Sequence, residues 1–399
     1  MSRLDDLITD LTSSRISRRR FMQSAAALGL SAPALHLLNT SHILAQDAGK
    51  ITWISPRGLL EVFDDYPYWV AKQYGWFGDI EAVIEPGPGA GAETLVAEGQ
   101  GDMAFPSPGV FSISLEQEVP IVSVFQMGAY DVFDFAFRKG EATDDLTTLE
   151  GKTIIIGNES WTSIVNPMLA AQGADHTSVE YAVGSFTTWL PLLQQGDGDA
   201  ALSWEGKRAE ATAAGLDFDY WLGLEHSDFP ANSFVIRKSD FDDPSTHQLY
   251  TDYLRGWAMG LEFGHHNPRA AAQITYNAEQ IADGIQTSFP PETVPDAIAS
   301  LWQLANVFRG DWPTRNGGQW GWHAPEAWDL WFETIRDIDQ LTKEFATGDV
   351  IKNDFVEGAN DFDHEMVAQA AADFELDELF SSVPEPEGAG SDGAYPTPA

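Results

Sequence analysis

A short helix–turn–strand pattern occurs twice in this sequence, 97 residues apart. Residues 95–109 and 192–206 both fit Leu-x-x-x-Gly-x-Gly-Asp-x-Ala. The glycines in this pattern allow the left-handed turn that reverses a helix into a strand. The repeat predicts a chain with two similar halves, each of which runs from a short strand into a loop. The alternative is a chance similarity between two unrelated helix–turn–strand units.

A second pair of similar segments indicates where the halves meet. Phe-Ala-Phe-Arg-Lys-Gly stands at 135–140 and Phe-Val-Ile-Arg-Lys-Ser at 234–239, and an acidic loop follows each. Both segments are typical of strands, and we interpret them as two crossings between lobes. The expected division is 50–137 plus 238–305 for lobe one and 138–237 for lobe two.

Predicted strands and helices alternate along the chain. This alternation favours an α/β fold in which each lobe is a mainly parallel sheet flanked by helices. Lobe two begins its own sheet at 151–157. In lobe one, strands are expected at 51–55, 80–85 and 102–105, and helices at 66–74 and 92–98.

The C-terminal part of the chain is predicted to be helical. Apolar residues recur at helical spacing in 250–262, 268–275 and 295–308. Six tryptophans cluster around the start of the next segment and predict a Trp-rich helical extension over 306–375. These side chains either pack the extension onto lobe one or dock a partner protein. Residues 376–399 are rich in Glu, Pro, Gly and Ser and are expected to be a disordered acidic tail.

Residues 1–45 are predicted to be an export signal. Ser17, the three arginines at 18–20 and Phe21 resemble the twin-arginine motif, and an Ala-rich apolar stretch follows them. That stretch is too short for a stable membrane span, and Ile43-Leu44-Ala45 offers a cleavage site. We therefore expect export by the twin-arginine pathway to a periplasmic or extracellular, surface-associated location. A buried amphipathic helix is the alternative, which three consecutive arginines fit badly.

Charge and cysteine content exclude several classes of function. The chain has 61 acidic and 22 basic residues, a formal net charge of -39, and no cysteine. Disulfides, thiol nucleophiles and Cys-ligated metals are therefore excluded. Nucleic acid is not an expected partner, because its phosphates would be repelled. An acidic surface poor in lysine favours a halophilic protein, since strong salt screens carboxylate repulsion; an ordinary acidic periplasmic protein is the alternative.

Three segments in the right order carry a family resemblance. Residues 66–77 are Tyr-Pro-Tyr-Trp-Val-Ala-Lys-Gln-Tyr-Gly-Trp-Phe, 149–154 are Leu-Glu-Gly-Lys-Thr-Ile, and 198–205 are Gly-Asp-Ala-Ala-Leu-Ser-Trp-Glu. Together with the export signal, they resemble the periplasmic substrate-binding proteins of ABC importers, in the NMT1/THI5-like and sulfonate-binding (SsuA-like) branch. The resemblance covers roughly residues 50–305. One departure is Gly206, where the family usually has proline.

The resemblance implies a fold, a role and partners. The expected fold is the two-lobe periplasmic-binding-protein fold of type II, here with extra C-terminal helices. A hinge between the lobes would let them close on a small-molecule ligand. The implied protein partners are the permease and the ATPase of an importer in the membrane. The protein is expected to be a monomer without a cofactor.

The predicted ligand site lies between the lobes, because ligands of open α/β sheets bind beyond the carboxyl ends of strands. Arg57 would clamp an anion or pair with surface acids. Trp161 and Trp204 would sandwich a flat heterocycle, cover a cation or fill the core. Glu205 would accept hydrogen bonds from an amino group, pair with a cation or have only a structural role. Tyr66 would line the cleft or pack in the core. The predicted ligand-binding residues are Arg57, Gly58, Tyr66, Ser107, Pro108, Gly109, Tyr130, Ser160, Trp161, Thr162, Trp204 and Glu205.

These residues leave the ligand class open. Aromatic side chains with carboxylates favour a heteroaromatic amine, such as a thiamine-type pyrimidine precursor. Arg57 and helix N-termini favour an organic anion, such as an alkanesulfonate, taurine or nitrate. We favour the amine, because the loops of lobe two carry Trp204 and Glu205 but no basic residue before Lys207.

A secreted enzyme related to pyrimidine synthases is the alternative from another class. The resemblance implies that such enzymes carry a Cys-rich motif, which this chain lacks. The sequence contains no nucleophile elbow, phosphate loop or zinc helix. His265-His266 has no third ligand at metal spacing. We therefore predict a binding protein with no catalytic residue and no metal site.

Overall fold

The computed structural model describes residues 49–56, 63–87, 91–185, 188–281, 294, 298, 301, 308–309 and 317–383. All the described elements belong to one structural unit, Lys50–Ala399. The predicted export signal, residues 1–45, lies outside the described residues. Among the helices of the described part, none has the length and apolar character needed to cross a membrane.

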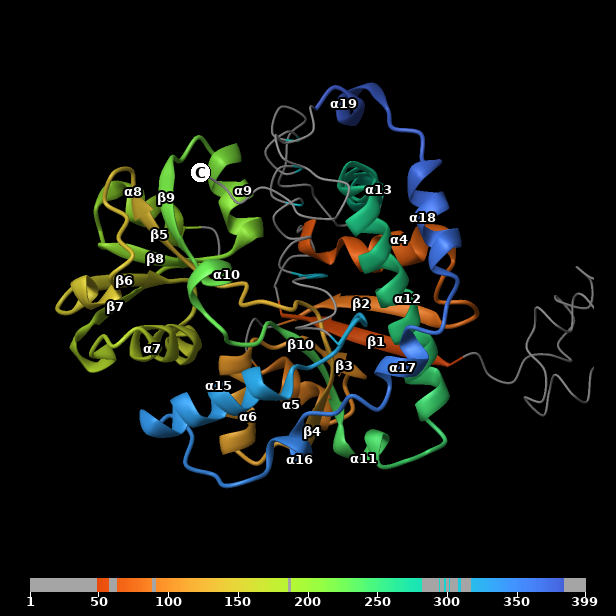
Figure 1. Ribbon diagram of the computed structural model, residues 1–399, viewed down its shortest axis with the longest axis horizontal. Coiled ribbons are helices and arrows are strands. Elements are labelled where there is room, and N and C mark those ends of the chain that lie inside the picture. Colours follow the sequence, from red (N-terminus) through yellow and green to blue (C-terminus); the bar gives the residue numbers. More distant parts are fainter. Residues whose placement is uncertain are drawn as a thin grey trace, which may run out of the picture. The chain divides into compact units, whose positions relative to one another are not determined.

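Two five-stranded sheets form the centres of two lobes (Figure 1). The first sheet contains β1 (Lys50–Ser55), β2 (Glu81–Pro86), β3 (Met103–Ala104), β4 (Ile121–Gln126) and β10 (Ser233–Arg237). The second contains β5 (Asp134–Arg138), β6 (Thr153–Ile156), β7 (Glu180–Val183), β8 (Ala200–Ser203) and β9 (Phe218–Leu222).

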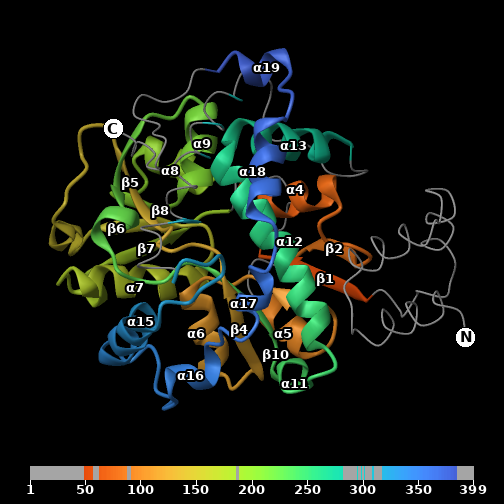
Figure 2. The ribbon, with the colours of Figure 1, turned by 45° about the vertical axis from the view of Figure 1, so that its right-hand side comes forward.

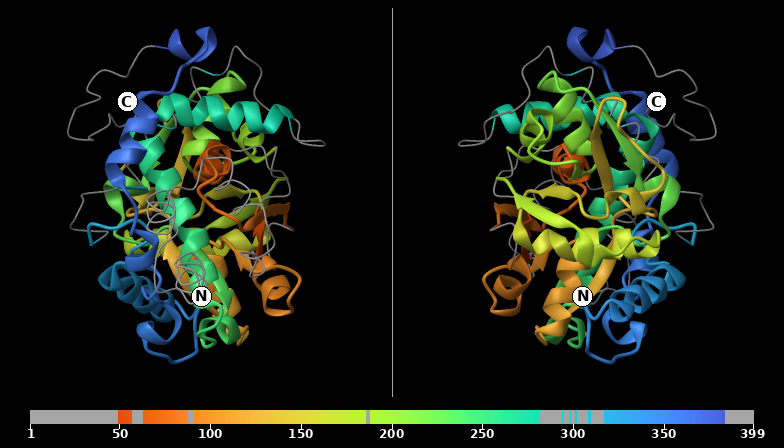
Figure 3. Two further views of the ribbon diagram at one scale, coloured as in Figure 1. Left: turned by 90° about the vertical axis from the view of Figure 1, so that its right-hand side faces the viewer. Right: turned by 90° about the vertical axis from the view of Figure 1, so that its left-hand side faces the viewer.

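The two sheets have the same topology. Their strand orders are β2-β1-β3-β10-β4 and β7-β6-β8-β5-β9. In each sheet the first three strands are parallel, and the fourth, β10 or β5, runs antiparallel to both neighbours. The predicted α/β fold with two similar lobes is confirmed. In the right-hand view of Figure 3, the yellow-green elements of lobe two lie in front of lobe one.

The chain passes between the lobes twice, in the segments 127–133 and 223–232. β5 therefore belongs to the second sheet and β10 to the first. The predicted lobe boundaries, after residues 137 and 237, are one strand too late. Both Arg-Lys segments are interior strands that pair on two edges, and the crossings come before them.

The two copies of the repeat take equivalent places in the two lobes. Asp102 precedes β3, and its Oδ2 accepts a hydrogen bond from the backbone N–H of Thr52 in β1 at 2.7 Å. Asp199 precedes β8, and its Oδ2 accepts one from the N–H of Thr153 in β6 at 3.0 Å. Each aspartate thus fastens its turn to the parallel strand beside it, β1 in the first sheet and β6 in the second.

The Arg-Lys strands complete the same unit in each lobe. Arg237, at the end of β10, donates a hydrogen bond to the carbonyl oxygen of Gly101 in the first copy of the repeat. Arg138, at the end of β5, donates one to Gly198 in the second copy. The two sequence similarities therefore have one structural cause, since both mark matching parts of duplicated lobes.

Helices flank both sheets. In lobe one they are α4 (Tyr66–Tyr74), α5 (Ala92–Ala97) and α6 (Pro108–Glu116), preceded by the 3-10 helix η1 (Phe63–Asp65). In lobe two they are η3 (Glu159–Trp161), α7 (Thr162–Ala171), α8 (Trp189–Gln195) and α9 (Glu205–Ala213), and the short helix α10 (Gly223–His226) begins the second crossing. The chain continues in α11 (Lys238–Phe241), α12 (His247–His266) and α13 (Pro268–Ile281).

The C-terminal region packs on lobe one. Its described helices are α15 (Pro325–Asp337), α16 (Thr347–Val350), α17 (Val356–Ala359), α18 (His364–Ala372) and α19 (Glu378–Ser381). Figure 2 shows α18 beside α12. The buried Trp328 and Trp331 of α15 donate indole N–H bonds to Gln126 Oε1 at 2.7 Å and Ser112 Oγ at 2.9 Å. These two tryptophans serve packing onto lobe one.

The predicted disordered tail, 376–399, is folded in its first part. Phe380 of α19 is 1% exposed within the apolar core of lobe one. Arg269 donates a hydrogen bond to the carbonyl oxygen of Val383 at 3.0 Å. The buried phenyl ring and this hydrogen bond hold the segment against α13. The acidic composition of the tail gave no sign of this packing. Residues 384–399 lie outside the described part.

Candidate functional site

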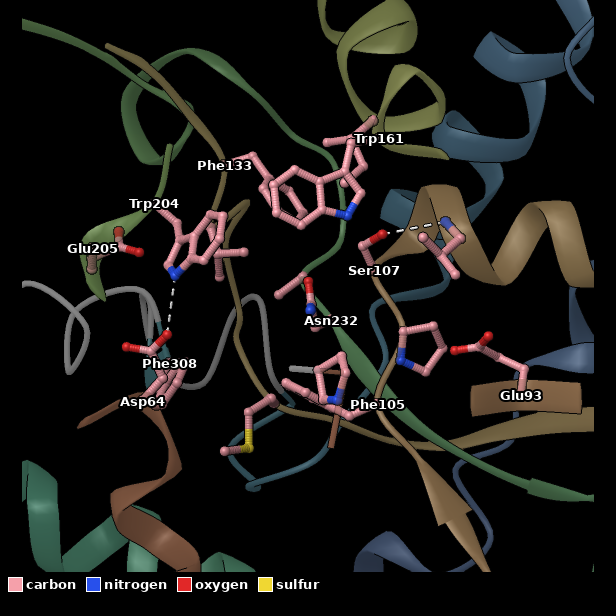
Figure 4. Close-up of a pocket in the computed structure, with 17 residues that line it drawn as sticks. Asp64, Glu93, Phe105, Ser107, Phe133, Trp161, Trp204, Glu205, Asn232 and Phe308 are labelled. Atoms are coloured by element: carbon pink, nitrogen blue, oxygen red, sulfur yellow. Dashed lines mark hydrogen bonds between the residues drawn. The ribbon is translucent and has the colours of Figure 1, made fainter. Parts of the chain in front are cut away.

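A cavity of about 90 Å³ lies between the two lobes (Figure 4). It has room for roughly six to nine water-sized groups. The crossings supply part of its wall, so a change of hinge angle would change the cavity. Its lining residues are Pro56, Asp64, Glu93, Phe105, Pro106, Ser107, Val110 and Phe308 from lobe one; Met127, Val132, Phe133, Ala231 and Asn232 from the crossings; and Trp161, Ile164, Trp204 and Glu205 from lobe two.

Two indole rings form a corner of this cavity. Trp161 follows β6 and Trp204 follows β8, at the carboxyl ends of neighbouring parallel strands. Their ring centroids are 5.7 Å apart and their planes meet at 78°. Both rings pack against Trp189, whose indole N–H donates to the carbonyl of Leu202 at 2.7 Å. The rings are nearly perpendicular, so they are not stacked face to face around a flat ring, which is one of the arrangements that the sequence left open.

A buried group of three charges stands behind Glu205. Arg208 Nη2 lies 3.4 Å from Glu205 Oε1, and its Nη1 lies 3.2 Å from Asp134 Oδ2. All three side chains are buried. Burial raises the pKa of Asp134 to about 6, although Arg208 opposes this rise. Burial, and then the nearby Asp134, raises the pKa of Glu205 well above its ordinary value.

Two further carboxyl groups line the cavity from lobe one, and the sequence did not predict them. Asp64 lies in η1, and its Oδ2 accepts a hydrogen bond from Trp204 Nε1 of lobe two at 3.2 Å. Glu93 lies in the first turn of α5 and is 2% exposed. Burial raises the pKa of the Glu93 carboxyl, although the backbone N–H groups of Glu93 and Gly91 oppose the rise. An acid just after the glycine-rich turn was the available signal for Glu93.

Asn232 places an acceptor at the cavity from the second crossing. Its Oδ1 atom is buried and has no hydrogen-bond partner among the described residues. Figure 4 shows this side chain amid the other lining residues. Buried polar atoms are normally hydrogen-bonded, so this oxygen is suited to receive a donor from a bound molecule. No motif marked Asn232, because its place depends on the path of the crossing.

Among the described lining residues there is no lysine, arginine or histidine. The nearest buried lysine, Lys207 of α9, lies behind the indoles. Its Nζ is 4.8 Å from the Trp189 ring centroid and 5.9 Å from that of Trp204. The cavity wall therefore presents carboxyl and amide oxygens with aromatic rings, a set that suits donor groups and positive charge.

Four of the predicted site residues, Ser107, Trp161, Trp204 and Glu205, come together at this cavity. Ser107 also caps α6, since its Oγ accepts the N–H of Val110 at 3.2 Å. The remaining predicted residues are Arg57, Gly58, Tyr66, Pro108, Gly109, Tyr130, Ser160 and Thr162; Arg57 and Gly58 lie outside the described residues, and the other six are not among the lining residues.

The structure gives those six residues other neighbours. Tyr66 is in the core of lobe one, stacked on Phe308 at 6.1 Å, and Tyr130 is partly buried against the same core. Pro108 and Gly109 begin α6, and a Cβ on Gly109 would lie 2.6 Å from the carbonyl oxygen of Ser163. This glycine thus permits close contact between α6 and α7 of the opposite lobe.

Ser160 and Thr162 organise the loop after β6. The Ser160 Oγ donates to Asn158 Oδ1 at 2.8 Å, and the Thr162 Oγ1 donates to the carbonyl of Glu159 at 3.1 Å. Both hydroxyls thus hold the turn that carries Trp161. Within the described part of the chain, no group of three His, Asp or Glu side chains has the geometry of a metal site.

Comparison with protein families gives one match of wide coverage. Residues 63–271, about half of the chain, match the model of the NMT1/THI5 like family. Among curated proteins, none matches this sequence.

Solved structures resemble the chain at low sequence identity. The alkanesulfonate-binding protein SsuA from Xanthomonas axonopodis pv. citri, bound to MOPS, has a TM-score of 0.56 at 11% identity, over 77% of this chain and 99% of that one. A ligand-binding component of an ABC-type import system from Staphylococcus aureus, with zinc bound, gives 0.53 at 11%, over 78% and 98%. The desulfurization enzyme DSZB gives 0.50 at 12%, over 78% and 98%. These likenesses show a shared fold.

Proposed function

Because the chain belongs to the NMT1/THI5-like family, we propose that it is the extracytoplasmic solute-binding component of an ABC importer. In this role the lobes close on a small organic molecule, and a permease with its ATPase receives that molecule from the closed form. The cavity between the lobes and the two crossings beside it support this proposal. Export through the twin-arginine pathway would follow from the arginine motif in residues 1–45.

The proposed ligand is a heteroaromatic amine, such as a thiamine-type pyrimidine precursor. The observation that carries this choice is the set of carboxyls, Asp64, Glu93 and Glu205, around one small cavity with no cation among its described lining residues. An anion placed there would be repelled by the carboxylates, whereas an amine would be attracted. The size of the cavity suits a single small ring with substituents.

The lining groups would divide the recognition between them. Glu93 and Glu205 would accept hydrogen bonds from an amino group or a protonated ring nitrogen. Asn232 Oδ1 would accept one more. The Trp161 and Trp204 rings would contact the heterocycle through one face and one edge, because they stand nearly perpendicular. Burial raises the pKa of both glutamates, and a bound cation would lower it again because a cation favours the charged form of a carboxyl group.

Calorimetric titration of the purified protein tests this ligand class. We expect saturable binding of 4-amino-5-hydroxymethyl-2-methylpyrimidine and none of taurine, methanesulfonate or nitrate. Glu93→Gln should weaken the binding about tenfold, since a neutral acceptor replaces a charged one. Glu98→Gln, at an exposed site outside the cavity, is the matched control. Wild-type protein that binds a sulfonate and no amine would refute the amine proposal.

An organic anion is the second candidate for the same role. Pro56 lines the cavity, and Arg57 follows it directly in the sequence. The alkanesulfonate-binding SsuA has a similar fold. The calorimetric series above includes taurine, methanesulfonate and nitrate, so it decides between the two ligand classes.

An enzymatic role, the third reading, has the similar fold of DSZB in its favour. We propose a binding protein, because family membership and the import-system likeness point to binding and the chain has no cysteine. Chromatography of the ligand after prolonged incubation tests this choice. A binder should return the compound unchanged, and stoichiometric binding followed by product would indicate an enzyme.

A further inference from the structure

A polar link between the lobes at the cavity involves Asp64. Asp64 belongs to η1 of lobe one and is 7% exposed. Its carboxylate reaches the beginning of α9 in lobe two, where it accepts the hydrogen bond from Trp204 Nε1. Figure 4 shows this bond crossing from η1 to the loop before Glu205. The Asp64 side chain of lobe one is therefore hydrogen-bonded to lobe two.

Gly206 leaves the space that this carboxylate occupies. A Cβ atom at Gly206 would lie 2.5 Å from Asp64 Oδ1 and 2.9 Å from Oδ2, well inside van der Waals contact. The carboxylate thus lies directly on the backbone of the first turn of α9. Any side chain at position 206 would displace it. The Asp64 carboxylate can therefore take this position only because residue 206 is a glycine.

The position is electrostatically suited to an anion. α9 runs over Glu205–Ala213, and the aligned peptide dipoles of a helix give its first turn a partial positive charge. Trp204 Nε1 adds a hydrogen-bond donor, which is directed at Asp64 Oδ2. The negative charge of Asp64 is one of the influences that raise the pKa of Glu205 next to it. Asp64 therefore takes the place that a bound carboxylate or sulfonate would take.

We infer that Asp64 is a built-in anion that occupies the start of α9 and makes the cavity selective against anionic solutes. An external anion must displace this carboxylate or lie beside it and Glu205, and both are unfavourable. A solute with a positive charge is instead attracted by these two carboxyl groups. The same contact joins the two lobes through one hydrogen bond. The consequence for ligand choice rests on the proposed solute-binding function, whereas the position of Asp64 does not.

Chemical rescue by small anions tests the inference. Asp64→Ala vacates the position, so its unfolding midpoint should fall and should then rise with added acetate or methanesulfonate at constant ionic strength. Wild-type protein and Asp197→Ala, an exposed aspartate far along the chain, should show no such rise. Calorimetry should give Asp64→Ala at least about a tenfold higher affinity for methanesulfonate than the wild type, a change equal to about 1.4 kcal/mol.

Two further variants keep the test informative. Asp64→Asn retains the shape of the side chain without its charge, and it should also gain methanesulfonate binding. It serves as the test if Asp64→Ala folds poorly. Gly206→Ala should displace the carboxylate and lower the unfolding midpoint while the chain keeps all its charges.

The outcomes separate this inference from the proposed function. Equal anion effects on Asp64→Ala, Asp64→Asn and Asp197→Ala would overturn the inference, whatever the wild type binds. Tight methanesulfonate binding by the wild type would also overturn it. Anion rescue in protein that binds no amine would leave Asp64 in its assigned place and refute only the amine ligand.

Discussion

At the scale of single residues, the site is governed by an imbalance of buried charge. Arg208 faces two carboxyls, Asp134 and Glu205, and one cation cannot neutralise both. One of them therefore keeps a proton to higher pH than an exposed acid would. Asp134 also accepts the backbone N–H of Gly223 at 3.1 Å, so it ties the end of the first crossing to the start of the second.

The pH dependence of stability should report this buried acid. The pKa of Asp134 is about 6 in the folded protein against 3.8 ordinarily. Between these values the unfolded chain loses the proton while the folded protein keeps it, so the free energy of unfolding falls as pH rises. The loss approaches about 3 kcal/mol by pH 6. Asp134→Asn should flatten this decline.

Chemical unfolding of both proteins from pH 4 to pH 7 measures the difference. Arg208 and Glu225 act on the pKa of Asp134. The readout is the slope of the free energy of unfolding against pH, because a lost ion pair changes mainly the offset of that curve. Parallel curves for the two proteins would show that Asp134 does not titrate in this range.

The sequence could predict some residues of the cavity for a clear reason. Trp161, Trp204 and Glu205 follow strands whose carboxyl ends face the other lobe, and strand ends can be read from local pattern. Asp64 and Asn232 could not be predicted in this way. Asp64 lies just before helix α4 of lobe one, and Asn232 lies on a crossing. Their places at the cavity depend on how the two lobes meet.

At the scale of elements, local pattern and long-range pairing have different predictability. The strand expected at 51–55 and the helix at 66–74 agree with β1 and α4 within one residue, because periodicity and a terminal glycine define them locally. The lobe boundaries were misplaced because β5 and β10 look alike in sequence whichever sheet they join. Sheet membership is set by the partner strand, which lies up to 133 residues away in the case of β10 and β3.

Helix α15 offers an element-scale test of C-terminal packing. The Trp328 indole N–H donates to Gln126 Oε1, at the point where the first crossing begins. Trp328→Phe keeps an aromatic ring but leaves this buried oxygen without its donor, which should cost about 1–3 kcal/mol of unfolding free energy. Trp331→Phe is the matched control, since Ser112 Oγ still donates to the Pro108 carbonyl.

Denaturant unfolding of the two variants gives the comparison directly. We expect the larger loss in Trp328→Phe, together with weaker ligand binding, because Gln126 adjoins the hinge. Equal losses in the two variants would mean that the ring volume removed, and not the hydrogen bond, sets the energy of this contact.

At the scale of the whole molecule, the dominant quantity is the net charge of -39. Ion pairs such as Lys238–Asp242 are exposed, and exposed pairs contribute at most about 1 kcal/mol each. The 61 acids outnumber the 22 bases by 39, so the charged side chains repel one another on balance. Their summed repulsion opposes the compact state, and it is the part of the energy that added salt changes most.

Stability should therefore rise with salt. The screening length falls from about 10 Å at 0.1 M to about 3 Å at 1 M, which removes repulsion between carboxylates several ångströms apart. The thermal midpoint of unfolding should increase over this range of KCl. Salt also weakens the few attractive ion pairs on the surface, which lowers the midpoint only slightly. Replacing exposed Glu85, Glu333 and Glu365 with Gln should raise the midpoint at 0.1 M and change it little at 1 M. This convergence distinguishes charge screening from a general effect of salt on apolar burial. A midpoint that falls between 0.1 M and 1 M KCl would show that attractive pairs outweigh the excess of carboxylates, and the halophilic interpretation would then be wrong.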